Sequence, residues 1–293
     1  MNGNTKAQRE LTMLYSCFTH VPGVGPAFEA KLHAMGIGSW DEALALPLPC
    51  GPAKAAALRA KIEESRERLA TGDARWFGNA LAPKEQWRLF PHFREQAAYV
   101  DIETTGLSWP DSAITTIALF DGTRVRTYVQ GVNLSAFADD ILDYKLLVTW
   151  NGRGFDAPFL RRALNIPLDK GDMAHLDLLP VFRSLGLRGG LKKVEAALGL
   201  SRGPLDGVDG LMAVRLWWEY ENSGNPRALE TLLAYNVADV LSLEVLAEYA
   251  LRRKCELEPH WETDRSPLPS VREELNPFTP DPRLLRKLGG WGG

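Results

Sequence analysis

Long hydrophobic runs are missing from this chain of 293 residues, and so is a large excess of charge of either sign. No segment supplies the roughly 18 consecutive apolar residues that a transmembrane helix needs. The first residues, "MNGNTKAQRELTML", lack the apolar core of a signal peptide, so we expect neither a leader nor a membrane partner. The formal net charge of −3 argues against a highly basic coat protein for nucleic acid, but it leaves room for a local binding site.

Cysteine is scarce as well, with only Cys17, Cys50 and Cys255 in the chain. Three widely separated cysteines without Cys-x-x-Cys spacing predict neither a disulfide framework nor a zinc site. They are typical of a reducing compartment, so we expect a cytoplasmic protein. The content of 45% hydrophobic and 24% charged residues is ordinary for a globular protein of one or two domains.

Composition divides the chain into four regions. Residues 1–75 form a small helical module, and residues 76–96 are an irregular connecting segment rich in aromatic side chains. Residues 97–254 have the pattern of an α/β domain. Residues 255–293 are a Pro-rich tail, for which we expect an extended course, with Trp261, Leu275 and Phe278 as points of attachment to the surface.

The periodicity of apolar residues predicts strands first and helices later in the α/β domain. The strands are expected at 97–103, 112–120, 123–131 and 145–151, and Asp121-Gly122 predicts a type I′ hairpin between the second and third. Helices are expected in the front module at 11–20, 25–36, 39–46 and 51–70, and in the domain at 156–165, 176–186, 190–200, 210–224 and 228–253. This order predicts α/β layers with a mixed sheet.

Two acids interrupt the apolar strand "AAYVDIETTGL". Asp101 and Glu103 are two positions apart, so both side chains leave the same face of the strand, and Ile102 leaves the other. Removing carboxylates from water costs several kcal/mol each unless they gain partners. The alternative is a strand edge with solvated acids. The turn that follows, residues 104–106, would let the backbone of a ligand approach closely.

Two further clusters of polar residues lie downstream. Asp156 in "TWNGRGFDAPFL" follows the fourth strand, where an α/β sheet binds its ligands, although Asp156 could instead cap the next helix. Tyr235 and Asp239 in "AYNVADVLSLEVL" are four positions apart and share one face of a helix. The alternative for Asp239 is a structural carboxylate bonded to a backbone group or an arginine.

Together the four acids, Asp101, Glu103, Asp156 and Asp239, meet the requirements of a two-metal site. Mg²⁺ and Mn²⁺ prefer hard oxygen ligands. Two such ions about 4 Å apart can hold the attacking and leaving oxygens of a phosphodiester. Four carboxylates would balance the charge of the ions, and Tyr235 would orient the attacking water or help to take its proton.

The three segments "DIETTGL", "NGRGFD" and "YNVAD" resemble the exonuclease motifs D-x-E, N-x-x-x-[FY]-D and Y-x-x-x-D of the DEDD superfamily, within the RNase H-like fold. Tyr235 corresponds to the tyrosine of the DEDDy branch. The wider segments "EQWRLFPHF", "HLDLLPVFR" and "GLMAVRLWWEY" resemble a bacterial family of RNase H-like domain proteins predicted to be exonucleases. The resemblance covers residues 77–253.

The resemblance implies an RNase H-like mixed sheet flanked by helices and a 3′–5′ exonuclease that uses two divalent ions, Mg²⁺ or Mn²⁺. It implies that the four acids bind metal and that nucleoside 5′-monophosphates leave a single-stranded 3′ end, with DNA favoured over RNA. The substrate contacts would be Thr104, Thr105, Gly106, Leu107, Asn151 and Phe155. Two alternatives stay open: a non-catalytic nucleic-acid-binding or repair scaffold, and an RNase H-like endonuclease.

The front module contains the turn Gly23-Val24-Gly25, which resembles the hairpin of a helix-hairpin-helix element. Backbone N–H groups beside a helix N-terminus suit a nucleic-acid phosphate. The alternatives are a glycine-rich turn between core helices and a protein-interaction module.

Other polar residues have open roles in the sequence. Arg153, Lys192 and Lys193 would contact phosphates or lie on the solvated surface. For His175 and Asp177 we favour helix capping or core hydrogen bonding over a substrate contact.

Overall fold

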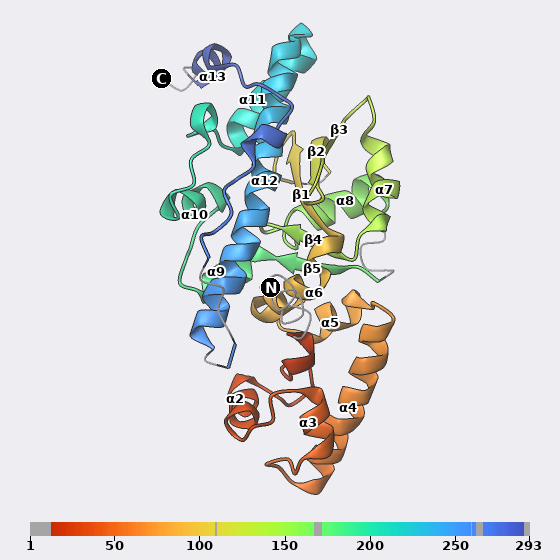
Figure 1. Cartoon of the computed structure of the whole chain (residues 1–293). Helices are drawn as coiled ribbons and strands as arrows, with labels where there is room; N and C mark the ends of the chain where they lie inside the picture. The colour runs from red at the N-terminus through yellow and green to blue at the C-terminus, as the bar shows by residue number, and fades with distance from the viewer. Residues whose placement is uncertain (1–12, 109, 167–171, 259, 262–265, 290–293) are drawn as a thin grey trace.

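The computed structural model describes residues 13–108, 110–166, 172–258, 260–261 and 266–289. Its centre is a five-stranded mixed sheet in the order β3-β2-β1-β4-β5 (Figure 1). The β1–β2 and β2–β3 pairs are antiparallel, and the β1–β4 and β4–β5 pairs are parallel. The predicted α/β class with a mixed central sheet is confirmed. The strands are β1 (Ala97–Thr104), β2 (Ile114–Phe120), β3 (Val125–Val129), β4 (Leu146–Thr149) and β5 (Ala174–Asp177).

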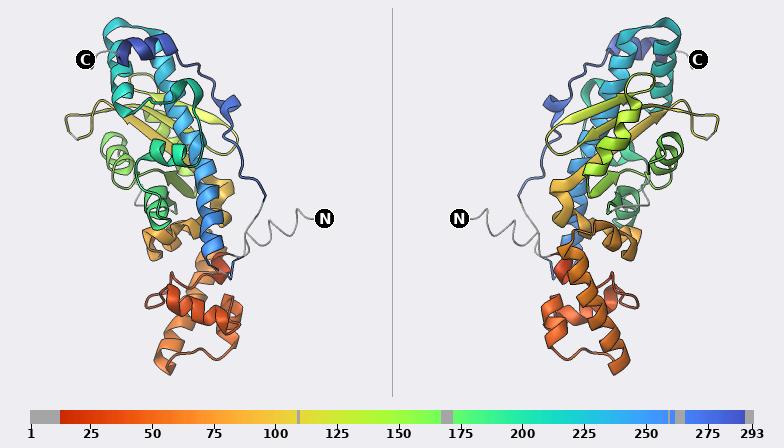
Figure 2. Two further views of the ribbon diagram at one scale, coloured as in Figure 1. Left: turned by 90° about the vertical axis from the view of Figure 1, so that its left-hand side faces the viewer. Right: turned by 90° about the vertical axis from the view of Figure 1, so that its right-hand side faces the viewer.

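Helices cover both faces of this sheet. α7 (Phe137–Asp140) and α8 (Asp156–Leu164) pack on one face, and α9 (Leu178–Ser184) and α12 (Pro226–Leu257) pack on the other. Figure 2 shows α12 running along the sheet toward the front helices, which gather at one end of the molecule. The other helices are α2 (Pro26–Ala34), α3 (Trp40–Ala45), α4 (Pro52–Ala70), α5 (Ala74–Ala80), α6 (Phe90–Phe93), α10 (Leu191–Ala197), α11 (Gly210–Ser223) and α13 (Pro282–Gly289).

The central strand β1 alternates between the two layers as its sequence predicts. Val100 and Ile102 join the apolar cluster on the side of α7 and α8. Tyr99 joins the cluster on the side of α12. Because side chains alternate along a strand, Asp101 and Glu103 leave the sheet on the α12 side, with Tyr99.

The fifth strand differs from the sequence expectation, which placed a helix over 176–186. β5 is four residues long, and a helix begins only after it, at Leu178. A four-residue run is too short to show a period, so its strand character comes from parallel pairing with β4. Tight packing fixes it further, since a Cβ added at Gly78 of α5 would lie 2.9 Å from the Cβ of Ala174.

The hairpin between β2 and β3 is present, but its turn is not the predicted type I′. Phe120 pairs with Val125, and the amide of Asp121 donates to the carbonyl of Arg124 at 3.3 Å. The central residues are therefore Gly122 and Thr123. Only Gly122 has a positive φ, of 88°, whereas a type I′ turn needs positive φ at both positions.

The front of the chain differs from the prediction in two places: residues 11–20 hold less helix than expected, and the segment expected to be irregular holds more. The helices predicted at 25–36, 39–46 and 51–70 are confirmed as α2, α3 and α4, but the one predicted over 11–20 shows only a 3-10 turn at Leu14–Ser16 within the described residues. The segment expected to be irregular holds α5, a 3-10 stretch at Pro83–Leu89 and α6. Aromatic side chains of this segment join the front helices and the sheet in one apolar cluster.

The C-terminal segment is also more ordered than predicted. Trp261, Leu275 and Phe278 pack against the apolar clusters, as expected, but the segment ends in helix α13 instead of staying extended. Leu284 and Leu285 of this helix are buried in the cluster that α11 and α12 form. Among the described residues, none of the helices combines the length and apolar character that crossing a membrane requires.

Candidate active site

Three of the predicted acids meet between the sheet and its longest helix. Asp101 and Glu103 project from β1, and Asp239 projects from the middle of α12. Carboxylate oxygens of these three residues lie within 4.8 Å of one another. Residues almost 140 positions apart in the sequence thus form one carboxylate group, which the following paragraphs call the acid cluster.

Asp156 stands beside the acid cluster rather than within it. It is the first residue of α8 and is buried, and the N-cap position belongs to Phe155, so the capping alternative does not hold. A hydrogen bond from the backbone amide of Ile102, between the two acids of β1, favours the charged form of Asp156. This contact links α8 to the strand that carries Asp101 and Glu103.

Without cations it is unfavourable for all of these buried acids to be ionised at once. Burial raises the pKa of Asp101 to about 6. Burial, followed by the negative charge of Asp101, raises the pKa of both Glu103 and Asp156 well above the usual range of a carboxyl group. Closely spaced oxygen donors with this excess of negative charge fit Mg²⁺ or Mn²⁺.

Tyr235 lies one turn before Asp239 on the same face of α12 and is almost completely buried. Burial first, and then the charges of Glu103 and Asp101, raise the pKa of its phenol. The phenol of Tyr235 therefore lies close enough to Glu103 and Asp101 to be affected by their charges.

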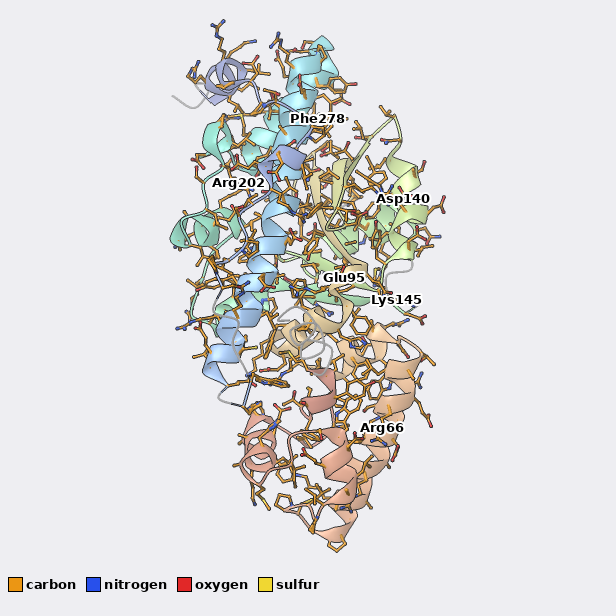
Figure 3. All side chains as sticks on the ribbon, viewed as in Figure 1. Arg66, Glu95, Asp140, Lys145, Arg202 and Phe278 are labelled. Atoms are coloured by element: carbon orange, nitrogen blue, oxygen red, sulfur yellow. The ribbon has the colours of Figure 1, made fainter. Side chains whose placement is uncertain are left out.

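Two cations contact the acid cluster directly. Lys192 Nζ, from α10, and the guanidinium of Arg202 both pair with the Oδ1 atom of Asp239. Arg202 also donates from Nε to Glu195 Oε2 at 2.9 Å, and its side chain is only 8% exposed. Figure 3 shows Arg202 on the α12 side of the sheet, opposite Asp140 of α7. The contact of Asp239 with an arginine, weighed as its structural alternative, is thus present.

Asn236 belongs to the site, although the sequence analysis did not single it out. Its Nδ2 atom donates to Asp101 Oδ2 at 2.7 Å, and its Oδ1 atom accepts from Thr116 Oγ1 at 3.0 Å. The signal in the sequence is an amide side chain among the apolar residues of a predicted helix. The structure shows that this amide is fully buried, and a buried amide needs hydrogen-bond partners.

Among the other polar residues that the sequence analysis considered, Arg153, His175 and Asp177 have hydrogen-bond partners within the protein, and Lys193 lies on the surface. Arg153 Nη2 donates to the carbonyl of His175 at 2.7 Å, and Lys193 is exposed on α10. Asp177 caps α9 by accepting from the amide of Leu179 at 3.0 Å, and His175 Nε2 shares a 2.8 Å hydrogen bond with Thr149 Oγ1. Capping and core hydrogen bonding are confirmed for this pair.

The predicted substrate residues at the end of β1 form a tight turn, which begins at Thr104, the last residue of the strand. Thr104 Oγ1 donates to the carbonyl of Gly106 at 2.5 Å, and the amide of Thr105 donates to Ala113 at 2.9 Å. Leu107 is 86% exposed, so its side chain is available to a ligand. The hydroxyl of Thr104 and the backbone of Thr105 are thus already used to hold the turn.

The predicted substrate residues after β4 lie in a second turn, which leads into α8. Asn151 has a φ of 61°, and its amide donates to Asp177 Oδ1 at 2.8 Å. Phe155 is half-buried, with its ring 5.0 Å from that of Phe159. The backbone of Asn151 is therefore anchored to the end of β5, and its side chain is exposed.

The predicted hairpin of the front module is a turn before α2. Gly23 has a φ of 78°, and Lys54 Nζ donates to its carbonyl at 3.0 Å. The amide of Val24 donates to Val21 at 3.0 Å, so this N–H group is already used inside the turn. Gly25 is the N-cap residue of α2.

Comparison with known proteins identifies the family of the sheet domain. A family model described as the RNase H superfamily matches residues 98–251, whereas no curated protein and no solved structure matches the chain. This superfamily generally consists of hydrolytic nucleases that cut phosphodiester bonds of nucleic acids and use divalent metal ions. Because the matched segment covers more than half of the chain, the protein belongs to the RNase H superfamily.

Proposed function

We propose that the protein is a metal-dependent 3′–5′ exonuclease of the DEDDy type, which releases nucleoside 5′-monophosphates from a single-stranded 3′ end. DNA is the favoured substrate over RNA. The observation that carries the proposal is the acid cluster of Asp101, Glu103 and Asp239, with carboxylate oxygens within 4.8 Å of one another. Asp156 beside it and Tyr235 on the face of α12 support the same assignment.

The acid cluster and Asp156 would together hold two divalent ions, Mg²⁺ or Mn²⁺. When bound, such ions supply charge that stabilises the attacking and leaving oxygens of a phosphodiester. The donor set fits them, because it consists of hard carboxylate oxygens. Burial raises the pKa of Asp101, Glu103 and Asp156, and the negative charge of Asp101 raises the pKa of the other two further.

The chain's own side chains would orient the reactants. Tyr235 is fixed by burial beside Glu103 and Asp101, so its hydroxyl would orient the attacking water. Leu107, exposed at the end of the turn after β1, would contact the terminal base, and the side chain of Asn151 would contact the terminal nucleotide from the turn after β4. The pattern Tyr-x-x-x-Asp on α12, formed by Tyr235 and Asp239, favours exonuclease over endonuclease action.

We also propose that residues 1–75 form a helix-hairpin-helix-like module that binds the nucleic acid at a distance from the acid cluster. Gly23 and Gly25 would approach a phosphate closely, since nothing lies within 4 Å of a Cβ added at either position. Residues 97–254 would form the exonuclease domain, residues 76–96 the connecting segment, and residues 255–293 the tail.

The decisive experiment incubates the protein with end-labelled single- and double-stranded DNA and RNA, in Mg²⁺, in Mn²⁺ or in EDTA. We expect ladders that shorten from the 3′ end only when metal is present, and a loss of at least 100-fold in rate for Asp101→Asn and Asp239→Asn. Asp143→Asn, at an exposed acid remote from the cluster, is the control and should keep the wild-type rate. Internal cuts or shortening from the 5′ end would contradict exonuclease action from the 3′ end, and binding without cleavage in every metal would favour a scaffold.

A further inference from the structure

Lys192 brings a positive charge into the acid cluster from a separate element. Its Nζ atom pairs with Oδ1 of Asp239, 47 positions away, and lies 4.4 Å from the centroid of the Tyr235 ring. The ammonium group thus occupies the space between the proposed water-orienting tyrosine and a proposed metal ligand.

Packing of α10 determines which of its two lysines reaches the site. Leu191 and Val194 are buried in the core and anchor the helix, which begins after Gly190. Lys192 consequently points toward α12, and Lys193, the next residue, is exposed to solvent. The chain therefore contains a matched pair of lysines, one inside the site and one outside it.

Asp239 does not depend on Lys192 for its neutralisation. Arg202 pairs with the same oxygen, is held by Glu195, and is almost completely buried. The side chain of Lys192 is 33% exposed and carries a single flexible ammonium group. Of these two cations, Lys192 is the one that can leave Asp239 without exposing a buried charge.

We propose that Lys192 binds a non-bridging oxygen of the phosphate at which the substrate is cut. It would do so once a metal ion replaces its ammonium group as the partner of Asp239. The inference rests on the proposed function, because it assigns a substrate contact within that site. A divalent ion at Asp239 competes with the ammonium group for the same carboxylate oxygen. The displaced lysine remains next to Tyr235, where a phosphate held by the metal site offers it a new anionic partner.

The first test measures Mn²⁺ binding by calorimetry, without substrate. Lys192→Met removes the competing charge and keeps the length of the side chain, so we expect it to bind Mn²⁺ about tenfold more tightly than wild type. Lys193→Met should bind Mn²⁺ as wild type does. Unchanged or weaker Mn²⁺ binding by Lys192→Met would overturn the proposal, and Lys192→Gln provides a second variant if thermal unfolding shows that the first does not fold.

The second test measures the affinity for thymidine 5′-monophosphate, a reaction product, in saturating Mn²⁺. We expect Lys192→Met to raise the Kd about tenfold, Lys192→Arg to restore most of the affinity, and Lys193→Met to leave it unchanged. An unchanged Kd for Lys192→Met would overturn the phosphate contact. Neither binding measurement depends on turnover. If the variants change Mn²⁺ and nucleotide binding as expected but the wild-type protein cleaves no nucleic acid, the proposed exonuclease activity is contradicted and the phosphate contact of Lys192 is not.

Discussion

At the scale of single residues, Asn236 decides how one acid of the cluster is oriented. It follows Tyr235 on α12, and its amide reaches across to Asp101 of β1 while Thr116 of β2 holds its carbonyl oxygen. Its Nδ2 atom also lies 3.2 Å from the backbone carbonyl of Asp101. A side chain bonded in this way to a proposed metal ligand would select the rotamer of that ligand before any ion binds.

We predict that Asn236→Ala lowers the affinity for Mn²⁺ and the rate of the proposed exonuclease reaction by about 10- to 100-fold, because Asp101 loses the donor that orients it. Thr116→Val should have a smaller effect, since the amide of Asn236 can still donate to Asp101. Calorimetry with Mn²⁺ and a 3′-end assay measure the two quantities. Asn222→Ala, at an exposed position of α11, is the control. Wild-type Mn²⁺ affinity in Asn236→Ala would contradict this role.

At the scale of elements, the connection from β4 to α8 positions Asp156. A Cβ added at Gly152 would lie 2.2 Å from Oγ1 and 2.6 Å from Cβ of Thr149, so the chain doubles back there too closely for any other residue. The carbonyl of Gly152 accepts from the amide of Ala157 at 2.8 Å, in the first turn of α8. The position of Gly152 is therefore coupled to that of Asp156.

Gly152→Ala should lower the free energy of unfolding by about 1–3 kcal/mol, because the added methyl group overlaps Thr149 and forces the connection outward. The same shift moves Asp156, so the rate of the proposed exonuclease reaction should fall in samples that are still fully folded. Urea denaturation and the 3′-end assay report the two effects. Gly210→Ala, at the exposed first position of α11 with open space around it, should lower neither, because alanine is a better helix former than glycine. Equal behaviour of both variants would show that the connection tolerates a side chain.

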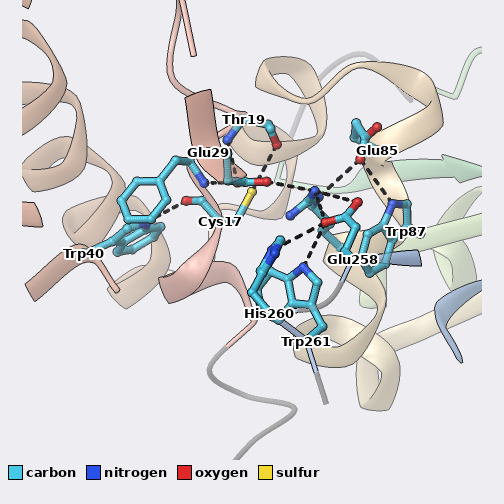
Figure 4. A network of polar contacts seen from close by, with 11 residues as sticks. Cys17, Thr19, Glu29, Trp40, Glu85, Trp87, Glu258, His260 and Trp261 are labelled. Atoms are coloured by element: carbon cyan, nitrogen blue, oxygen red, sulfur yellow. Dashed lines mark hydrogen bonds and ion pairs between the residues drawn. The ribbon is translucent and has the colours of Figure 1, made fainter. Parts of the chain in front are cut away.

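At the scale of the whole molecule, a network of polar contacts that includes Glu29, Glu85 and Glu258 joins the front module to the end of α12 (Figure 4). Arg88 is fully buried, and its Nη2 atom pairs with Glu29 of α2 at 3.0 Å and with Glu258 at 2.8 Å. Its Nε atom lies 3.3 Å from Glu85. Glu258 immediately follows α12, so the network connects the proposed nucleic-acid-binding module to the C-terminal end of the helix that carries Tyr235 and Asp239.

We expect Arg88→Met to lower the free energy of unfolding by about 3–5 kcal/mol, because three carboxylates would remain together without their cation. The shared apolar core predicts that the front helices and the sheet domain unfold in a single transition, which circular dichroism and tryptophan fluorescence would follow in urea. Arg253→Met is the control, since its pair with Glu256 is exposed to solvent and should leave the stability close to that of wild type. If Arg88→Met unfolds at the same urea concentration as the wild-type protein, a structural role for the network is contradicted.

Much of this architecture follows from local periodicity. A strand places residues two positions apart on one face, which puts Asp101 and Glu103 together, and a helix does the same for Tyr235 and Asp239. The apolar periods also predicted four of the strands and the major helices of the sheet domain. These features are local, because the geometry of the backbone within a few residues determines which side chains share a face.

Only the tertiary structure decided which distant groups meet. The sequence alone determined the α/β class, the mixed sheet and the two pairs of candidate site residues that share a face of one element. Tertiary packing decided that β5 is a strand, that Asp156 stands beside the acid cluster, and that Lys192 and Arg202 both reach Asp239. It also brought Arg88 to Glu258, 170 positions away. The physical reason is that such contacts depend on how whole elements pack across the sheet, and no repeat along the chain encodes that packing.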